Sequence, residues 1–159
     1  MIKPHGSDTL NSLLVTDNQL LQQLLTEAES LPSIVLNSAA AANAVMMGAG
    51  YFNPLTGYMN LADSLNVAEN LHTEDGLFWP VPVVNLVKDT SAIEGASRIA
   101  LRDPNTEGNP VMAIMDLAAI ETVSDAQIET MAEQIFATLD PQHPGCLLYT
   151  SDAADEEDS

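Results

Sequence analysis

The stretch that decides the fold reads RIALR (98–102), DPNTEGNP (103–110) and VMAIMDL (111–117). The two outer runs are mainly aliphatic, and the run between them is dense in turn-forming Asp, Asn, Gly and Pro. This pattern predicts two strands joined by a turn. Helical patterns flank the pair on both sides, without a regular alternation of strand and helix. The sequence therefore predicts an α+β fold.

Helices are predicted where a capping residue precedes a run of helical apolar spacing. Thr16 with Gln19, and Ser124 with Gln127, have the spacing of a capping box. The predicted helices follow Thr16 as far as Ser30, Ser38 as far as Gly48, Asn60 as far as Leu71, and Ser124 as far as Asp140.

Two further segments are predicted to be extended. Residues 33–37 have the composition of a short buried strand, and residues 77–87 are rich in β-branched and aromatic side chains. Pro80 and Pro82 lie two residues apart, so in a strand both would remove an N–H group from the same edge. Segment 77–87 is therefore predicted at a sheet edge, or where a strand enters the sheet.

The charge balance argues against two classes of partner. The chain has 4 Lys and Arg residues against 23 Asp and Glu residues, a formal net charge of −19 at pH 7. Nucleic-acid binding needs several bases to neutralise phosphates, and anionic lipid surfaces repel such a chain. We expect no nucleic-acid partner and no membrane partner. The lack of a secretory signal and the single Cys146 predict a cytoplasmic location.

Arg98 and Arg102 are two of only four bases, and their spacing in a predicted strand puts both on the same face. One interpretation pairs them with a phosphate, another anion or the carboxylates of a neighbouring domain. The other interpretation, which we favour, is that they balance local acids such as Asp103 and Glu107.

No catalytic, metal or cofactor site is predicted. Gly48 and Gly50 follow a helix, and Asn53 stands where a dinucleotide fingerprint has its third glycine, so we interpret the glycines as a helix stop and a tight loop. Glu74-Asp75 is interpreted as a solvated turn rather than an acid/base pair. The three histidines and seven methionines show no ligand spacing.

The composition changes after Gly145. Residues 146–159 hold five of the 23 acids, no base and the only cysteine. Positions 146–156, CLLYTSDAADE, resemble the in-frame translation of a transposon adapter used in sequencing libraries. We therefore interpret 1–145 as the domain and 146–159 as an extraneous acidic tail. We expect the tail to be disordered, because so few apolar residues cannot offset its ordering entropy.

A family resemblance spans essentially residues 1–145. The residues that carry it are Gly50, Phe52, PLTGYM at 54–59, DGLFWPVP at 75–82, and RIALRDP with EGNP within 98–110. With them the chain resembles the N-terminal domain of ATP sulfurylase, also called sulfate adenylyltransferase, in the branch found in sulfur-oxidising bacteria.

This resemblance implies a fold and a parent reaction. The implied fold is PUA-like, a small curled β-barrel with surrounding helices, here expected to lack its last strands. The implied parent reaction, ATP + sulfate ⇌ adenylyl sulfate + pyrophosphate, uses ATP with Mg²⁺. The family's nucleotide-binding signatures, Gln-x-Arg-Asn and Gly-Arg-Asp-His, do not occur in the chain. We therefore expect an inactive scaffold domain of a truncated enzyme, with no catalytic, cofactor-binding or metal-ligating residue.

The resemblance also implies partners. These are the missing catalytic domain of the same polypeptide and, through a strand edge left open, a second copy of the chain. The alternative is a stand-alone PUA-like module that binds RNA or another protein, although the acidic charge opposes RNA binding.

Overall fold

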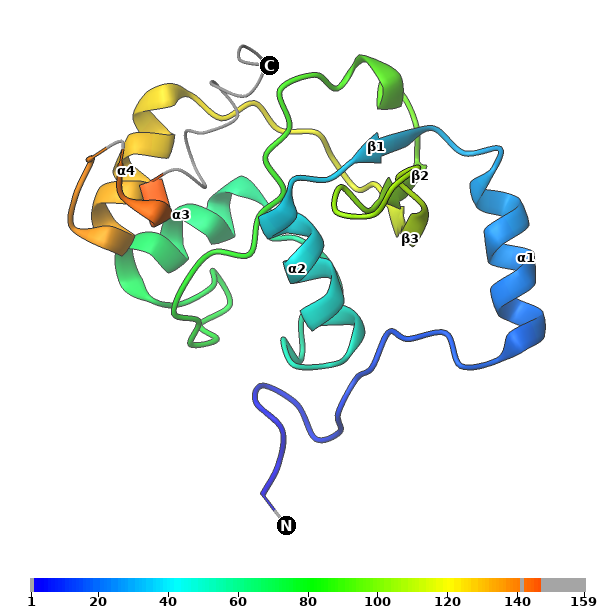
Figure 1. Ribbon diagram of the computed structural model, residues 1–159. Helices are drawn as coiled ribbons and strands as arrows, with labels where there is room; N and C mark the ends of the chain where they lie inside the picture. Colours follow the sequence, from blue (N-terminus) through cyan, green and yellow to red (C-terminus); the bar gives the residue numbers. More distant parts are fainter. Residues whose placement is uncertain (1, 141, 147–159) are drawn as a thin grey trace. The chain divides into compact units, whose positions relative to one another are not determined.

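The computed structural model describes residues 2–140 and 142–146, which divide into two compact units. Unit 1 comprises Met1–Tyr58 and Asp89–Ile120, and unit 2 comprises Met59–Lys88 and Glu121–Ser159. Each unit is therefore built from two separate pieces of the chain. Both helices and strands occur (Figure 1), so the predicted α+β class is confirmed.

Unit 1 is built on a three-stranded sheet in the order β1 (Ser33–Val35), β2 (Arg98–Arg102) and β3 (Val111–Asp116). The predicted hairpin is confirmed, because β2 and β3 are antiparallel, with a shift of register between Leu101 and Arg102. The strand predicted at 33–37 is confirmed in its first three residues, and it pairs parallel to β2.

The expected barrel, predicted to lack its last strands, is not closed in the described residues. Closing a barrel requires enough strands for the sheet to curl back on itself. The sheet of the described residues has only three strands, of three, five and six residues, and no pairing joins β1 to β3.

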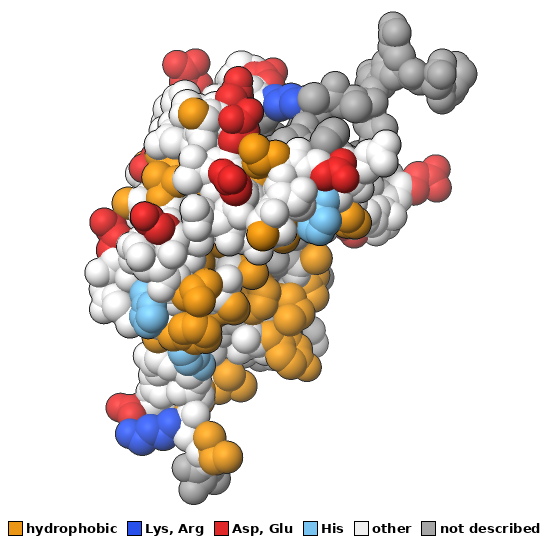
Figure 2. All heavy atoms as spheres, turned by 90° about the vertical axis from the view of Figure 1, so that its left-hand side faces the viewer, with side chains coloured by type: hydrophobic (Ala, Val, Ile, Leu, Met, Phe, Trp, Pro, Cys, Tyr) orange, Lys and Arg blue, Asp and Glu red, His pale blue; other side chains and the backbone are white. Residues whose placement is uncertain are grey.

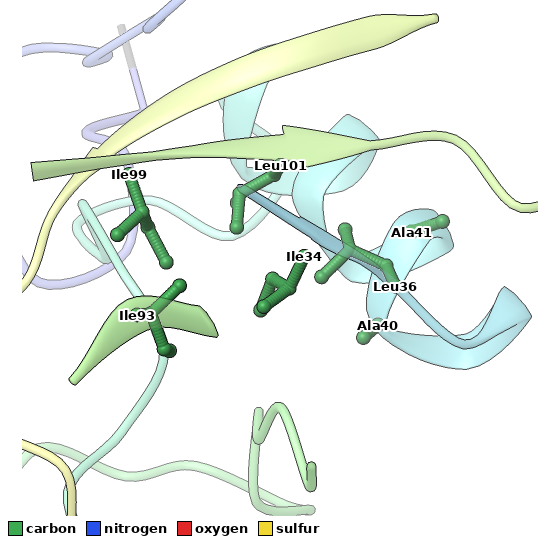
Figure 3. Packing of buried hydrophobic residues seen from close by; sticks show 7 residues of the cluster. All are labelled: Ile34, Leu36, Ala40, Ala41, Ile93, Ile99 and Leu101. Atoms are coloured by element: carbon green, nitrogen blue, oxygen red, sulfur yellow. The ribbon is translucent and has the colours of Figure 1, made fainter. Parts of the chain in front are cut away.

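One face of this sheet forms the core of unit 1. In Figure 3, Ile99 and Leu101 project from β2 toward Ile93 of the short helix η1 (Ser91–Ile93) and Ile34 of β1. The helix α2 (Ser38–Gly48) adds the buried Ala40 and Ala41 to the same cluster. The remaining helix of unit 1, α1 (Asn18–Ala28), packs beside β3.

Both helices at the start of unit 1 begin one residue away from the predicted cap. The carboxylate of Asp17, rather than Thr16, accepts the backbone N–H of Leu20 at the start of α1, at 2.7 Å. At α2 the side chain of Asn37, rather than Ser38, accepts the N–H of Ala40, at 2.8 Å. Each predicted residue adjoins an acidic or amide side chain that caps at least as well.

In unit 2, the helices α3 (Leu61–Asn70) and α4 (Asp125–Phe136) pack against each other. Their predicted caps are confirmed: Asn60 caps α3, and Ser124 with Gln127 forms a complete capping box on α4. The core of the pair is Ala68 and Met131. Partly buried apolar side chains surround these two residues: Leu65, Val84, Leu86, Val123, Ile128, Ile135 and Phe136.

The strand predicted at 77–87 does not form, and this prediction is wrong. Only Phe78 takes part in a bridge, to His72. The backbone groups of this segment bind neighbouring turns instead: Trp79 N donates to Leu71 O at 2.8 Å, and Val83 O accepts from Met59 N, also at 2.8 Å. With two prolines the segment lacks the donors that a continuous ladder needs.

The predicted tail boundary at Gly145 stays a prediction. Residues 147–159, most of the proposed tail, lie outside the described residues. Cys146, assigned to that tail, is buried, and its Sγ lies 3.2 Å from the carbonyl oxygen of Thr138. Within residues 2–140 and 142–146, no helix is long and apolar enough to span a membrane.

Candidate functional site

The loop after α2 holds the N-terminal segment in place. Asn53 is buried, and its side-chain amide donates to the carbonyl of His5 and to the hydroxyl of Ser7, each at 2.7 Å. Its Oδ1 accepts the backbone N–H of Asn11 at 2.8 Å. All three hydrogen bonds reach residues 5–11, which we call the N-terminal strap.

Two glycines that precede Asn53 in the chain lie close to the N-terminal segment. Gly48 ends α2, and its carbonyl accepts the N–H of Leu13 at 2.9 Å. Gly50 has a φ of +81°, and a Cβ there would lie 3.1 Å from the carbonyl oxygen of Asn11. The interpretation as a helix stop and a tight loop is confirmed, because α2 ends at Gly48 and the turn that follows has Gly50 at a positive φ.

Arg98 lies between two carboxylates. Its Nε is 3.4 Å from Glu27 Oε1 on α1 and 3.4 Å from Asp116 Oδ1 on β3. Both distances exceed the roughly 2.7–2.9 Å of a charge-assisted hydrogen bond, so the contacts are ion pairs in a side chain that is 41% exposed. Arg98 therefore balances nearby acids, but not the Asp103 and Glu107 that the sequence indicated.

Arg102 binds neutral groups. Its Nε donates to the hydroxyl of Ser33 at 3.0 Å, and its Nη1 donates to the carbonyl of Asn109 at 3.2 Å. The side chain thus connects β1 to the turn between β2 and β3. Since Arg98 contacts carboxylates and Arg102 contacts uncharged oxygens, the structure does not bring the two guanidinium groups to a common anion.

The turn around Glu74 and Asp75 is exposed, as interpreted from the sequence. The Thr73 hydroxyl donates to the carboxylate of Asp75, and this hydrogen bond lowers the pKa of Asp75 below its usual range. The backbone N–H of Glu74 donates to Asp63 Oδ1 at 2.7 Å. A carboxylate with a lowered pKa stays ionised near neutral pH and is poorly suited to act as a general acid.

A second carboxylate is held in the same way in the turn between β2 and β3. The Thr106 hydroxyl donates to Asp103 Oδ2 at 2.7 Å, and the N–H of Asn105 donates to Oδ1 at 2.8 Å. These hydrogen bonds, that of Thr106 first, lower the pKa of Asp103. The acid is therefore a turn-forming residue.

The described residues offer no converging set of ligands. Among them, no group of three or more His, Cys, Asp or Glu side chains is placed to hold a metal ion. A shallow, open depression on α1 is lined by Gln19, Gln22, Gln23 and Thr26, uncharged residues of one helix. Figure 2 shows one face, on which acidic side chains are dispersed and outnumber Lys and Arg. The prediction that the chain contributes no catalytic, metal or cofactor residue stays a prediction.

Comparison with known proteins places the chain in a family. The family model described as a PUA-like domain matches residues 2–154. The chain belongs to the PUA-like domain family. The match extends nine residues past the predicted boundary at Gly145.

The predicted resemblance to sulfate adenylyltransferase is confirmed. Proteins of that name are 63% identical over 145 residues in Alcanivorax borkumensis and 56% identical over 151 residues in Allochromatium vinosum. A third, from the Riftia pachyptila sulfur-oxidizing endosymbiont, is 48% identical. These matches cover 91%, 95% and 95% of the chain, but only 36%, 38% and 34% of the relatives. The chain therefore spans about a third of the length of these relatives.

A solved structure matches most of this chain. The hexameric APS kinase from Thiobacillus denitrificans is 32% identical and superposes with a TM-score of 0.60. The match covers 74% of this chain and 23% of that protein. The similarity thus extends to the fold as well as to the sequence.

Proposed function

We propose that this chain is the PUA-like scaffold domain of a sulfate adenylyltransferase, and that polypeptide outside it carries out the reaction. The observation behind the proposal is the high identity of relatives that this chain covers only to about a third of their length. The proposed setting is sulfate assimilation or sulfur metabolism in the cytoplasm, with the rest of the enzyme as the first partner.

The chemistry of the parent reaction supports the assignment of this chain as a scaffold and of the reaction to polypeptide outside it. A sulfate oxygen attacks the α-phosphorus of ATP, and the negative charge that develops on the leaving pyrophosphate must be stabilised by cations. The chain has only four bases, and Arg98 and Arg102 bind groups of unit 1. With so few bases, two of them already bound within unit 1, we expect the chain to be inactive alone.

The contacts of Lys3, Arg98 and Arg102 do not support the RNA-binding alternative. A phosphate backbone is bound by Lys and Arg gathered on one face. Lys3 pairs with Asp8 at 2.5 Å, Arg98 lies between two carboxylates, and Arg102 donates to neutral oxygens. We therefore do not propose nucleic-acid binding.

Two measurements test the proposal. In the first, the purified chain is incubated with ATP, Mg²⁺ and sulfate, and pyrophosphate release is followed against a sample without protein. We expect no release above that control, and sulfate-dependent release would contradict the assignment as a scaffold.

In the second, residues 1–145 replace the matching third of the Alcanivorax borkumensis enzyme. We expect the chimera to retain adenylyl sulfate formation, because the replaced region is 63% identical. The unmodified enzyme and a version lacking the domain are the controls. A chimera that folds, with normal circular dichroism and cooperative melting, yet is inactive would overturn the proposal.

A further inference from the structure

The turn that follows α3 contains a pair of residues prone to react with each other. Asp75 is the only aspartate or asparagine of the chain that is followed by glycine. Both Asp75 and Gly76 are exposed, and Gly76 has a φ of +86°. Because glycine has no side chain, little hinders its backbone nitrogen from approaching the side-chain carboxyl of the residue before it.

The reaction between these two groups rearranges the backbone and needs only water. The nitrogen of Gly76 forms a bond to Cγ of Asp75, while the carboxyl loses its hydroxyl group, which leaves as water with the proton of the nitrogen. Water then opens the cyclic imide at one of its two carbonyls. Opening at the side-chain carbonyl restores aspartate, whereas opening at the backbone carbonyl leaves isoaspartate, in which the chain runs through the side-chain carbon.

Thr73 holds both groups that would react. Its hydroxyl donates to Oδ1 of Asp75, and its backbone carbonyl accepts the N–H of Gly76 at 2.9 Å. Thr73 is itself buried, with 6% of its surface exposed. The carboxylate must therefore leave the hydroxyl, and the N–H must leave the carbonyl, before the new bond can form.

Thr73 is fixed in turn by its neighbours. Its N–H donates to the carbonyl of Leu77 at 2.9 Å, and its hydroxyl oxygen accepts the N–H of Leu77 at 3.1 Å. The side-chain amide of Asn66, on α3, donates to the Thr73 carbonyl at 3.2 Å. The hydrogen bond from Thr73 is also the main cause of the lowered pKa of Asp75, and an ionised carboxylate must gain a proton before its oxygen can leave.

We propose that Asp75-Gly76 is the site at which the backbone of this chain isomerises, and that Thr73 suppresses the reaction in the folded state. This inference goes beyond the proposed function and stands without it. Isoaspartate adds one carbon atom to the backbone inside a short turn, in which Thr73 and Leu77 face each other and His72 bridges to Phe78. The modified chain cannot keep these pairings in register.

Long incubation of the full chain near neutral pH tests the proposal. Isoaspartate is measured by transfer of a labelled methyl group from S-adenosylmethionine, catalysed by a protein isoaspartyl methyltransferase, and is located by peptide mapping. We expect isomerisation at Asp75 to be at least about tenfold slower in the native chain than in the chain unfolded in guanidinium chloride. Thr73→Val should speed the native reaction about tenfold, the factor that corresponds to one hydrogen bond to a charged group.

Two variants serve as controls. Thr73→Ser keeps the hydroxyl and should react as slowly as the wild type. Thr130→Val, on α4 in the same unit, removes a hydroxyl that donates to the carbonyl of Ala126 at 2.8 Å, and should leave the rate at Asp75 unchanged. Circular dichroism and cooperative melting check that each variant folds.

Three results would overturn the proposal. These are equal rates in the native and unfolded wild-type chain, a folded Thr73→Val variant that reacts as slowly as the wild type, and isoaspartate that accumulates mainly at another residue. If Thr73→Val does not fold, Asp75→Asn replaces it, because the amide oxygen still accepts from Thr73. Its deamidation adds a negative charge, which isoelectric focusing detects. Deamidation should be slower in the native than in the unfolded variant, and equal rates would again contradict the role of Thr73.

Discussion

Replacing Asn53 by alanine should release the N-terminal strap while the rest of unit 1 stays folded. The substitution removes hydrogen bonds to His5, Ser7 and Asn11, at 2.7, 2.7 and 2.8 Å. Each is worth about 0.5–1.5 kcal/mol net, so the total is about 3 kcal/mol. Because every partner lies in the strap, the loss should appear first as local opening.

Amide hydrogen exchange measures that opening directly. A loss of about 3 kcal/mol corresponds to roughly a hundredfold faster exchange at the N–H of Asn11, which Asn53 accepts in the native chain. In a domain of this length it also lowers the melting temperature by about 6–12 °C. Exchange in the β2–β3 hairpin should be much less affected, since the Asn53 side chain hydrogen-bonds to the strap and these strands pair with each other.

Two further variants make the test specific. Asn53→Asp keeps the acceptor for Asn11 but loses both donors, so its exchange rate should fall between those of the wild type and Asn53→Ala. Asn43→Ala, on α2, removes an amide with no side-chain hydrogen bond in the described part of the chain, and should leave the strap protected. Unchanged exchange at Asn11 in Asn53→Ala would refute the assignment.

The remaining predictions concern caps, glycines and a carboxylate. Asp17→Ala should destabilise the chain by about 1 kcal/mol in urea unfolding, and Asp17→Asn by much less, because the amide still caps α1. Gly50→Ala should lower the melting temperature, since its φ is +81° and the new Cβ would crowd the strap, whereas Gly48→Ala, with an ordinary 3.5 Å contact, should not. In NMR titrations, Thr73→Val should raise the pKa of Asp75. The stability linked to that carboxylate is present above its usual value of 3.8 and is lost as pH falls through the lowered native pKa, so the variant should lose less stability on acidification.

The parts of the fold that could be predicted from sequence depend on neighbours in the chain. The hairpin of residues 98–117 follows from two apolar runs and the turn formers between them. The cap of α4 follows from the spacing of Ser124 and Gln127, which satisfy each other's backbone groups. Where two capping residues stand side by side, as Thr16 and Asp17 do, the pattern locates the helix but not its first residue.

Contacts between distant segments could not be predicted in the same way. The two acids beside Arg98 come from α1 and β3, although Asp103 and Glu107 are closer to it in sequence than Glu27 is. The role of Asn53 was missed, although a buried amide in an uncharged stretch must find hydrogen-bond partners. The prolines at 80 and 82 were a sound signal against a central strand, but the β-branched and aromatic composition of 77–87 still indicated a strand, which the prolines placed at an edge.

The parallel pairing of β1 with β2 has a consequence for synthesis of the protein. Ser33 and Arg102, which are joined by a hydrogen bond, lie 69 residues apart in the chain. At a translation rate of about 5–20 residues per second, β2 is synthesised about 3–14 s after β1. During this interval the uncharged stretch from 30 to 62 emerges without the strands that bury its apolar residues, and it is then a natural target for the chaperones that bind nascent chains.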